Sequence, residues 1–367
     1  MLKRTIRPRG IAVVMTLVFM AVVGLACGKA SETGGGAEPG LKVGLLLPDS
    51  RVARWDKFDR PLMEKKIKEL CSACTVEYSN ARGDVGIQQQ QMDAMITNDV
   101  DALILGSVDA KALSSSVERA HDADIPVIAY DRLAEGPISA YVSFDGEEVG
   151  RIQAEELLRG MGDKADGGQI VMVNGDVVAD PNAVSFKRGA LSVLQDRVKI
   201  GKMYDVQAYL PETAYDDVSG AVGALGADNI DGVYAVNDGL AAAAISALKA
   251  GLVAPLPPVT GQDAELTALQ RILVGDQHMT AYKPFKPEAD GAAALAVALG
   301  RGENLGDIAK EEVNSPSGDQ TPAVLLTPVS VTVENIKETV IKDGMYTIDQ
   351  VCSPKFASAC EKAGLLD

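Results

Sequence analysis

The sequence has few of the side chains on which many hydrolases and cofactor enzymes depend. Its 367 residues include two histidines, His121 and His278, and neither stands in a motif with a serine or cysteine nucleophile. No Walker loop, H-E-x-x-H motif or EF-hand spacing occurs, and no G-x-G-x-x-G motif follows the first expected strand. These absences disfavour nucleophile-based hydrolases, nucleotide enzymes and zinc proteases, and the sequence predicts no metal and no cofactor.

Positive charge is also in short supply. The sequence has 35 lysines and arginines against 51 aspartates and glutamates, which gives a formal net charge of −16. The phosphates of nucleic acid and an anionic membrane surface would repel such a chain, so neither is expected as a partner and a neutral or cationic ligand fits better. A chain of 367 residues is longer than a domain with a single hydrophobic core usually is, and two domains are therefore expected.

The N-terminal segment has the pattern of an export signal. In residues 1–27, four basic residues precede an apolar run from Ile11 to Ala26, which ends at Cys27. This arrangement is typical of a lipoprotein signal peptide in which Cys27 carries the lipid, with plain secretion as the alternative. Residues 28–40 are rich in Gly and predict a flexible tether. We therefore expect an extracytoplasmic or periplasmic protein that contacts the membrane through its lipid.

Four further cysteines fall into two local pairs. Cys71 and Cys74 are separated by two residues, and Cys352 and Cys360 by seven. Outside the cytoplasm an even number of cysteines indicates disulfides. Three pairings are possible, and pairing within each local pair is preferred because it needs no assumption about the fold. No histidine lies near either pair, which disfavours structural zinc.

Short aliphatic runs alternate with segments of helical periodicity from Leu41 onward. The expected strands are 42–47, 75–79, 102–105, 126–130, 141–144, 169–174, 232–237, 258–261 and 279–282. Expected helices between them include 86–100, 109–123 and 146–162, the last with Asp145 as its N-cap. This alternation predicts parallel βαβ units, and the number of strands predicts an α/β protein of two doubly wound lobes.

Polar side chains follow most of the expected strands in both halves. Ligands of doubly wound sheets bind beyond the carboxyl ends of the strands. The residues found there include Arg54, Trp55, Lys57, Asp131, Arg132, Asn182, Asp238, Asp263 and Lys283. The pattern predicts one polar site between two lobes.

This set of side chains suits a sugar. Carboxylates accept hydrogen bonds from hydroxyls, arginine and lysine donate them, and an aromatic face covers the apolar face of a sugar ring. Trp55, the single tryptophan of the sequence, is a candidate for that role, although packing in a core is the ordinary use of a tryptophan. The alternative is a glycoside-processing enzyme with Asp131 and Asp263 as its paired carboxylates, which the architecture disfavours.

Eight stretches in consistent order resemble the periplasmic-type sugar-binding proteins of ABC importers, and their D-xylose-binding members above all. The resemblance covers roughly residues 41–345. It rests on RWDK (54–57), VIAYDRL (127–133), YVSFDGEEVGRIQAEEL (141–157), YLPETA (209–214), AVNDGLAAAAISAL (235–248), GQDAELTALQRI (261–272), MTAYKP (279–284) and LLTPVSVTVENIKETVIKDG (325–344). LacI-type repressors share this core, but the sequence lacks their N-terminal DNA-binding helix pair.

The resemblance implies a type I periplasmic binding protein, with two Rossmann-like lobes joined by a multi-strand hinge. Its first lobe would comprise 41–142 and 284–307 and its second lobe 143–283 and 308–346, followed by a cysteine-containing tail, 347–367. The lobes would close on a monosaccharide and signal occupancy to an ABC permease in the membrane. A monomer is expected.

The resemblance also assigns the ligand-binding residues. They are Arg54, Trp55, Lys57, Asp131, Arg132, Asn182, Tyr209, Asn237, Asp263 and Lys283. Tyr209 is a departure, since the xylose-binding pattern has a second tryptophan there. D-Xylose is the expected ligand, with glucose, ribose or arabinose as alternatives.

Overall fold

The computed structural model describes residues 40–366 except 51, 53 and 319. The expected signal peptide with Cys27 and all but the last residue of the expected tether lie outside the described residues. Within the described part of the chain, no helix is both long enough and apolar enough to span a membrane.

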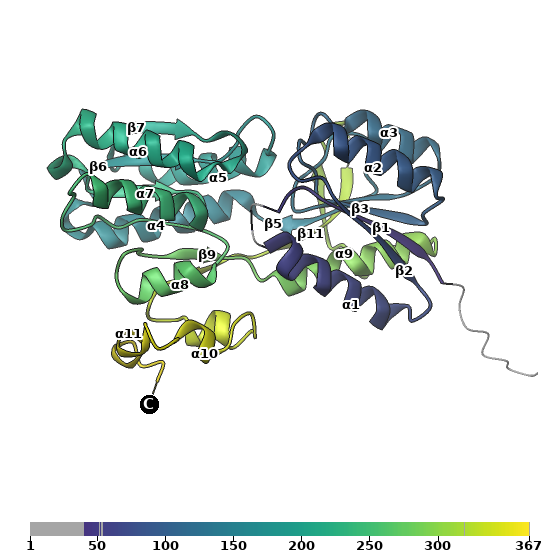
Figure 1. Ribbon diagram of the computed structural model, residues 1–367. Helices are drawn as coiled ribbons and strands as arrows, with labels where there is room; N and C mark the ends of the chain where they lie inside the picture. Colours follow the sequence, from purple (N-terminus) through teal and green to yellow (C-terminus); the bar gives the residue numbers. More distant parts are fainter. Residues whose placement is uncertain (1–39, 51, 53, 319, 367) are drawn as a thin grey trace, which may run out of the picture. The chain divides into compact units, whose positions relative to one another are not determined.

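The first lobe is built on a seven-stranded sheet (Figure 1). Its strand order is β10-β11-β5-β4-β3-β1-β2, and every pairing is parallel except that of β10 with β11. The strands are β1 (Lys42–Leu47), β2 (Thr75–Asn80), β3 (Ala102–Leu105), β4 (Val127–Tyr130), β5 (Ala140–Phe144), β10 (Glu311–Asn314) and β11 (Gln320–Leu326).

Helices cover both faces of this sheet. One apolar cluster joins the sheet to α1 (Arg60–Leu70) and α9 (Phe285–Gly300), and another joins it to α2 (Val85–Thr97) and α3 (Ser114–Asp122). Strands β3, β4 and β5 are buried along their whole length because both faces are covered, which explains their mostly apolar sequences. The short π-helix η1 (Trp55–Asp59) leads from the loop after β1 into α1.

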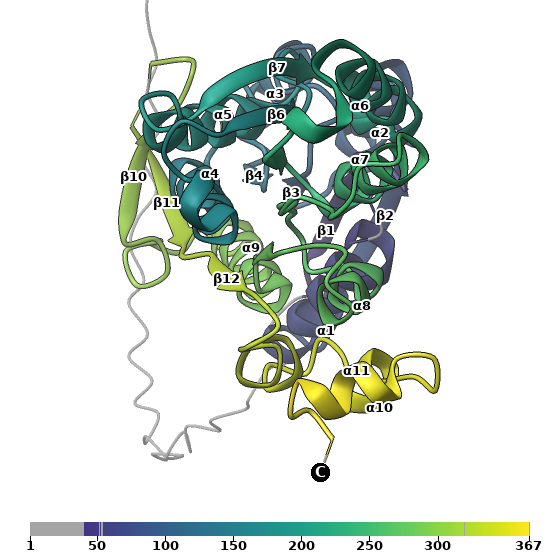
Figure 2. The same cartoon turned by 90° about the vertical axis from the view of Figure 1, so that its left-hand side faces the viewer.

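The second lobe contains a three-stranded parallel sheet of order β7-β6-β8 and a small antiparallel pair, β12 with β9. Helices α4 and α5 pack together on one side of the three-stranded sheet, and α6 and α7 pack together on the other (Figure 2). The elements are β6 (Gln169–Asn174), β7 (Lys199–Asp205), β8 (Gly232–Ala235), β9 (Thr280–Tyr282), β12 (Val329–Val331), α4 (Gly146–Met161), η2 (Gly162–Lys164), α5 (Pro181–Leu194), η3 (Gln207–Tyr209), α6 (Pro211–Leu225), η4 (Ala227–Asn229), α7 (Asp238–Ala250) and α8 (Leu266–Leu273).

The chain passes between the lobes three times: from β5 to α4, from β9 to α9 and from β11 to β12. Two of these crossings are tied together, since the amide of Asp145 donates to the carbonyl of Leu326 at 3.2 Å. The side chain of Asp145 accepts from the amide of Glu148, so Asp145 is the N-cap that the sequence predicted for α4.

Several segments differ from the prediction. Residues 308–346 were expected in the second lobe, but β10 and β11 join the first lobe, where β11 extends the parallel sheet beside β5. From β12 onward the segment packs in the second lobe, where β12 pairs with β9. Strand β7 was not predicted because it is an edge strand with exposed Lys199 and Lys202, and it lacks the aliphatic run of a covered strand.

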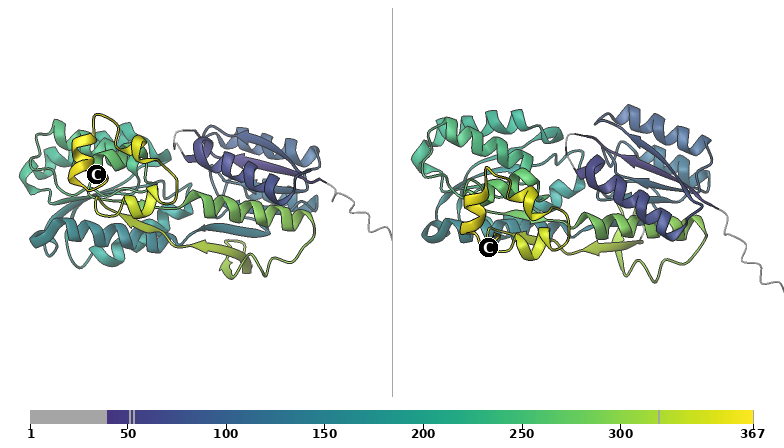
Figure 3. Two further views of the ribbon diagram at one scale, coloured as in Figure 1. Left: turned by 90° about the horizontal axis from the view of Figure 1, so that it is seen from below. Right: turned by 60° about the horizontal axis from the view of Figure 1, so that its bottom comes forward.

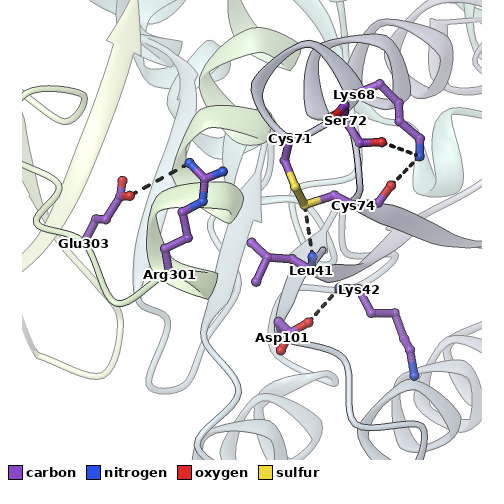
Figure 4. Close-up of a disulfide and its surroundings, with 9 residues drawn as sticks. All are labelled: Leu41, Lys42, Lys68, Cys71, Ser72, Cys74, Asp101, Arg301 and Glu303. Atoms are coloured by element: carbon purple, nitrogen blue, oxygen red, sulfur yellow. Dashed lines mark hydrogen bonds and ion pairs between the residues drawn. A yellow bond between two sulfur atoms is a disulfide. The ribbon is translucent and has the colours of Figure 1, made fainter. Parts of the chain in front are cut away.

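Both cysteine pairs form the local disulfides that were preferred from the sequence. Cys71 and Cys74 span the turn between α1 and β2 (Figure 4). The sulfur of Cys74 accepts a hydrogen bond from the amide of Leu41 at 3.1 Å, and Lys68 donates to the carbonyl of Cys74. This disulfide therefore holds the start of β1 against the end of α1.

The cysteine-containing tail lies against α8 (Figures 1 and 3). It follows η5 (Lys337–Ile341) and contains α10 (Ile348–Val351) and α11 (Ala357–Lys362), with Cys352 bonded to Cys360. One apolar cluster contains Leu269 and Ile272 of α8 together with Val351 and Cys360 of the tail. The tail is thus part of a folded core.

Candidate functional site

One cavity lies between the two lobes, at the carboxyl ends of their strands. We call it the polar cavity. Its lining comprises Val52, Arg54, Trp55, Asp131, Arg132, Asp180, Asn182, Phe186, Tyr209, Asn237, Gln262, Asp263 and Lys283. Nine of the ten predicted site residues are in this lining, and its free volume is about 30 Å³.

Local backbone geometry sets the direction of several of these side chains. Asp131, directly after β4, has φ 60°, and Asp263 has φ 90°; both lie in the left-handed region that few residues other than glycine adopt. Such strained positions concentrate at functional sites. Asn237 is the N-cap of α7, where its side-chain oxygen accepts from the amide of Leu240 at 2.9 Å. The amide nitrogen of its side chain stays available for another partner.

Arg54 is held by three carboxylates. Its Nη2 donates to Asp59 at 2.8 Å and to Glu288 at 2.5 Å, while its Nη1 donates to Asp131 at 2.9 Å. The hydroxyl of Tyr130 donates to Asp59 from the same buried cluster. Charge-assisted hydrogen bonds to these three carboxylates therefore fix the position of the guanidinium. Asp59 and Glu288 were not predicted, because they lie on helical segments and not after a strand.

The charges in this cluster shift one another's pKa values. Burial raises the pKa of Asp131, but Lys283, Arg54 and Arg132 outweigh it and lower that pKa to about 2. Burial raises the pKa of Glu288 to about 8 against the opposing effect of Arg54. The ammonium nitrogen of Lys283 lies 3.5 Å from Asp131 Oδ1 and 3.4 Å from Asp263 Oδ1. Asp131 is thus ionised at neutral pH, while Glu288 titrates near it.

Trp55 both packs in a core and lines the polar cavity. It is 2% exposed and packs in the core of the first lobe, with an edge contact to Tyr130 at 6.3 Å between ring centroids. The guanidinium of Arg54 lies 4.5 Å from the centroid of the indole ring. The same indole forms part of the wall of the polar cavity. Packing therefore orients a ring that remains accessible from the cavity.

Four buried polar atoms of the lining have no hydrogen-bond partner among the described residues. They are Trp55 Nε1, Arg132 Nε, Gln262 Oε1 and Asp263 Oδ1. Two of them lie in ion pairs, since Arg132 Nε is 3.2 Å from Asp180 Oδ2 and Asp263 Oδ1 is 3.4 Å from Lys283 Nζ. Buried polar groups without a partner are rare in folded proteins, and each one carries a free-energy penalty. The indole N–H of Trp55 and the side-chain oxygens of Gln262 and Asp263 therefore offer one donor and two acceptors to a ligand with hydroxyl groups.

The two walls of the polar cavity also touch each other. Arg132 Nε lies 3.2 Å from Asp180 Oδ2, and the side-chain amide of Asn182 donates to the carbonyl of Asp131 at 2.8 Å. Tyr209 donates to Asp180 at 2.7 Å. Arg132 and Asp131 follow β4 of the first lobe, whereas the other three belong to the second. The described conformation is therefore a closed one.

Lys57 is the one predicted residue that the structure does not bring to the polar cavity. Its ammonium lies 4.9 Å from the ring centroid of Phe58 and 5.2 Å from that of Tyr346. Because Lys57 lies on the turn of η1 that follows Trp55, its side chain emerges on another side of the helix. Asp180, Gln262, Val52 and Phe186 line the polar cavity but were not assigned to the site from the sequence.

The described residues contain no group of three or more His, Cys, Asp or Glu side chains placed to hold a metal ion. The donor set of the polar cavity also mixes carboxylates with arginine and lysine cations. Such a lining favours hydrogen bonding to an organic ligand over metal coordination.

The fold and this cleft have counterparts among known proteins. A model of the periplasmic binding protein domain matches residues 43–304. The chain belongs to the periplasmic binding protein family. Its fold is the type I form of that family, as the sequence predicted, and membership places this periplasmic binding protein outside the cytoplasm.

Individual relatives cover most of this periplasmic binding protein. The chain is 37% identical over 317 residues to the D-xylose-binding periplasmic protein of Haemophilus influenzae, covering 85% of this chain and 92% of that one. It is also 37% identical over 312 residues to the protein of the same name from Escherichia coli, covering 83% and 91%. A solute-binding protein from Clostridium phytofermentans, solved with β-D-glucose, superposes with a TM-score of 0.78 at 28% identity, covering 84% and 99%.

Proposed function

We propose that this protein is the sugar-binding component of an ABC importer and that it holds D-xylose in the polar cavity. The observation that carries the proposal is a set of three buried lining atoms without a hydrogen-bond partner among the described residues, Trp55 Nε1, Gln262 Oε1 and Asp263 Oδ1, the last of which is paired only with the ammonium of Lys283 at 3.4 Å. A sugar hydroxyl both donates and accepts, so one ring can complete hydrogen bonds with all three.

The charge of the lining favours an uncharged ligand. Three cationic and three anionic side chains surround the polar cavity, namely Arg54, Arg132, Lys283, Asp131, Asp180 and Asp263. A charged ligand would add an uncompensated charge to a closed space, which costs free energy. A neutral polyol instead gains charge-assisted hydrogen bonds of about 1.5–3 kcal/mol each.

The names of the relatives support D-xylose as the first ligand to test. Two relatives at 37% identity are named for D-xylose, while the related solute-binding protein was solved with β-D-glucose. Glucose, ribose and arabinose are the alternatives. Tyr209 replaces the tryptophan of the xylose-binding pattern, and a smaller ring at this wall alters the space beside a sugar.

Closure of the lobes supplies the mechanism. A free volume of about 30 Å³ holds only one or two water molecules, so a sugar reaches the polar cavity after the lobes separate about their three crossings. The bound sugar then contacts both lobes and favours the closed state through its higher affinity for it. A membrane permease recognises the closed state as the form that carries a bound sugar.

We propose binding without catalysis. A glycoside-processing enzyme needs a carboxylic acid that donates a proton, and such acids have raised pKa values. Lys283, Arg54 and Arg132 hold Asp131 ionised, with its pKa lowered to about 2 although burial opposes them. Incubation with aryl xylosides is expected to release no phenol, and release abolished by Asp263→Asn would contradict this proposal.

We propose further that Cys27 anchors a monomer to the membrane through a lipid. Cys27 follows the apolar run of the export signal, which is the position of the lipid-bearing residue in lipoproteins. The Cys27→Ser variant is expected to leave the membrane fraction, whereas wild type stays with it. Equal partitioning of both would contradict the anchor, and light scattering on the domain from residue 41 tests the monomer.

A titration tests the central proposal. The single tryptophan of the sequence forms part of the cavity wall, so its fluorescence reports on the site. Addition of D-xylose is expected to change this fluorescence and to release heat in a calorimeter. Ribose, arabinose and glucose, titrated in parallel, rank the alternatives. Absence of both signals with all four sugars would reject the proposal.

A further inference from the structure

A second cavity adjoins the polar cavity. Val52, Arg54 and Asp263 belong to the linings of both, so the two spaces meet at these side chains. The second space has a volume of about 230 Å³ and is enclosed by η1 and the starts of α8 and α9, together with Met345 and Tyr346. We call it the aromatic cavity.

Three aromatic rings give this cavity its character. Phe58 lies 5.6 Å from Phe285 and 5.8 Å from Tyr346, measured between ring centroids. Phe285 and Tyr346 are buried, and the hydroxyl of Tyr346 accepts from the amide of Leu266 at 3.2 Å, which fixes the ring. Aromatic faces of this kind cover the apolar faces of ring-shaped ligands.

Polar groups stand at the edge of the same cavity. Lys57, Glu265 and Thr267 belong to its lining, and Lys57 lies over the rings of Phe58 and Tyr346. An apolar pocket with a few polar groups is the usual composition of a small-ligand site. For comparison, an apolar cavity of about 150 Å³ is large enough to hold benzene. The aromatic cavity therefore has room for a six-membered ring.

Asp263 marks the junction between the two cavities. Its residue is 7% exposed, and Oδ1 has no hydrogen-bond partner among the described residues. Because Asp263 lines both spaces, a ligand that reaches this oxygen is positioned to extend from one cavity into the other.

We propose that this protein binds glycosides, in which a sugar ring in the polar cavity is joined through its glycosidic oxygen to a second ring in the aromatic cavity. The inference rests on the sugar-binding function proposed above and extends its ligand class. The second ring is either another sugar or an aromatic group, since both present an apolar face to Phe58, Phe285 and Tyr346. It also gives Lys57 a place at the second ring.

Calorimetric titration of the full chain with four ligands tests this inference. The probes are D-xylose, xylobiose and the phenyl α- and β-D-xylosides. At least one ring-extended probe is expected to bind about ten-fold or more tightly than D-xylose, because the second ring leaves water for an apolar cavity. A gain with xylobiose identifies a sugar as the second ring, and a gain with a phenyl xyloside alone identifies an aromatic group.

A variant that fills the aromatic cavity locates the second ring. Thr267 is exposed at the start of α8 and lines this cavity, so Thr267→Trp is expected to occupy the space without disturbing a core. The affinity ratio of the ring-extended probe to D-xylose should fall to near one. Thr97→Trp, at an exposed position at the end of α2, is the matched control and should leave the ratio unchanged.

Each contrary result has a distinct meaning. If D-xylose binds and no ring-extended probe binds more tightly, the inference is wrong and the proposed function stands. If the preference survives in Thr267→Trp, the second ring lies elsewhere, for example beside Asp176 and Asp109 on the other side of Tyr209, and the inference is again wrong. If no probe binds, D-xylose included, both proposals are rejected.

Discussion

The two walls of the polar cavity differ in how their polar groups are partnered. On the first-lobe wall, Arg54 is bonded to Asp59, Glu288 and Asp131 of the same lobe. On the second-lobe wall, Gln262 Oε1 and Asp263 Oδ1 have no hydrogen-bond partner among the described residues, and Trp55 Nε1 is the corresponding atom of the first lobe. The charged cluster around Arg54 is thus internally compensated, whereas most of the open hydrogen-bonding capacity lies on the second-lobe wall.

This difference separates stability from binding. Truncating a group of the compensated wall leaves buried charges without a partner, which destabilises the fold. Truncating an open group removes a bond that forms only with ligand, which lowers affinity and spares the fold. We therefore expect substitutions in the cluster around Arg54 to act chiefly on stability and substitutions of the open groups to act chiefly on binding.

The largest effect is expected at Arg54. Arg54→Met leaves Asp59, Glu288 and Asp131 without their main cationic partner, so the free energy of unfolding should fall by about 3–5 kcal/mol. Urea unfolding followed by circular dichroism measures the loss. Arg60→Met, which removes an exposed pair with Glu64, is the control and should change stability by less than about 0.5 kcal/mol. If both variants lose the same free energy of unfolding, the buried cluster around Arg54 contributes no more to stability than an exposed ion pair, which contradicts this prediction.

The next largest effect concerns the open wall. Asp263→Asn should weaken sugar binding about ten- to a hundred-fold, because one charge-assisted bond to a hydroxyl is replaced by a neutral one. Asparagine adopts the left-handed backbone of this position and Lys283 keeps its contact with Asp131, so the unfolding free energy should fall by less than in Arg54→Met. Calorimetry and urea unfolding are the measurements. Asp276→Asn, in an exposed pair with Lys249, should change neither quantity.

A pH profile tests the compensated wall without removing Arg54. Burial raises the pKa of Glu288 from 4.5 to about 8, so the unfolded chain loses this proton at lower pH than the folded one. The stability that protonation of Glu288 contributes is complete below pH 4.5 and is lost as pH rises toward 8, by at most about 1.4 kcal/mol per pH unit. Glu288→Gln should match wild type near pH 5 and be more stable at pH 8. If wild type and Glu288→Gln differ in unfolding free energy by the same amount at pH 5 and at pH 8, the assignment to Glu288 is contradicted.

The smallest effect is expected at Tyr209. Tyr209→Phe keeps the ring and removes the hydroxyl that donates to Asp180, so affinity for D-xylose should change by less than about ten-fold. Arg132 continues to hold Asp180. Tyr215→Phe, at an exposed position of α6, is the control. If Tyr209→Phe loses as much affinity for D-xylose as Asp263→Asn does, the hydroxyl of Tyr209 contributes as much to binding as Asp263, which contradicts this prediction.

The sequence predicted the parts of the fold in which hydrophobic pattern decides structure. Strands β1, β3 and β6 have the bounds that their aliphatic runs predicted. Strand β11 was not predicted because Pro322 interrupts it, and its place at β5 depends on pairing between distant segments. The run 258–261 was expected as a strand but forms only a single bridge through Val259.

The predictable part of the site is the part that follows strands. Asp131, Asn237 and Asp263 come directly after or close to aliphatic runs, and all three line the polar cavity. Glu288 and Asp59 lie on helical segments and reach Arg54 only through tertiary packing, which no local pattern contains. Lys57 belongs to the resembling motif RWDK, but the helical turn directs it to the aromatic cavity.

The contacts from Arg132 to Asp180 and from Asn182 to Asp131 already join the lobes in the described conformation. A ligand that displaces these bonds has a net affinity equal to the difference between its own interactions and the bonds that it replaces. The same bonds re-form when the ligand departs, which lowers the free energy of the empty closed state. A binding protein built in this way has a lower affinity for its ligand and releases the ligand more readily.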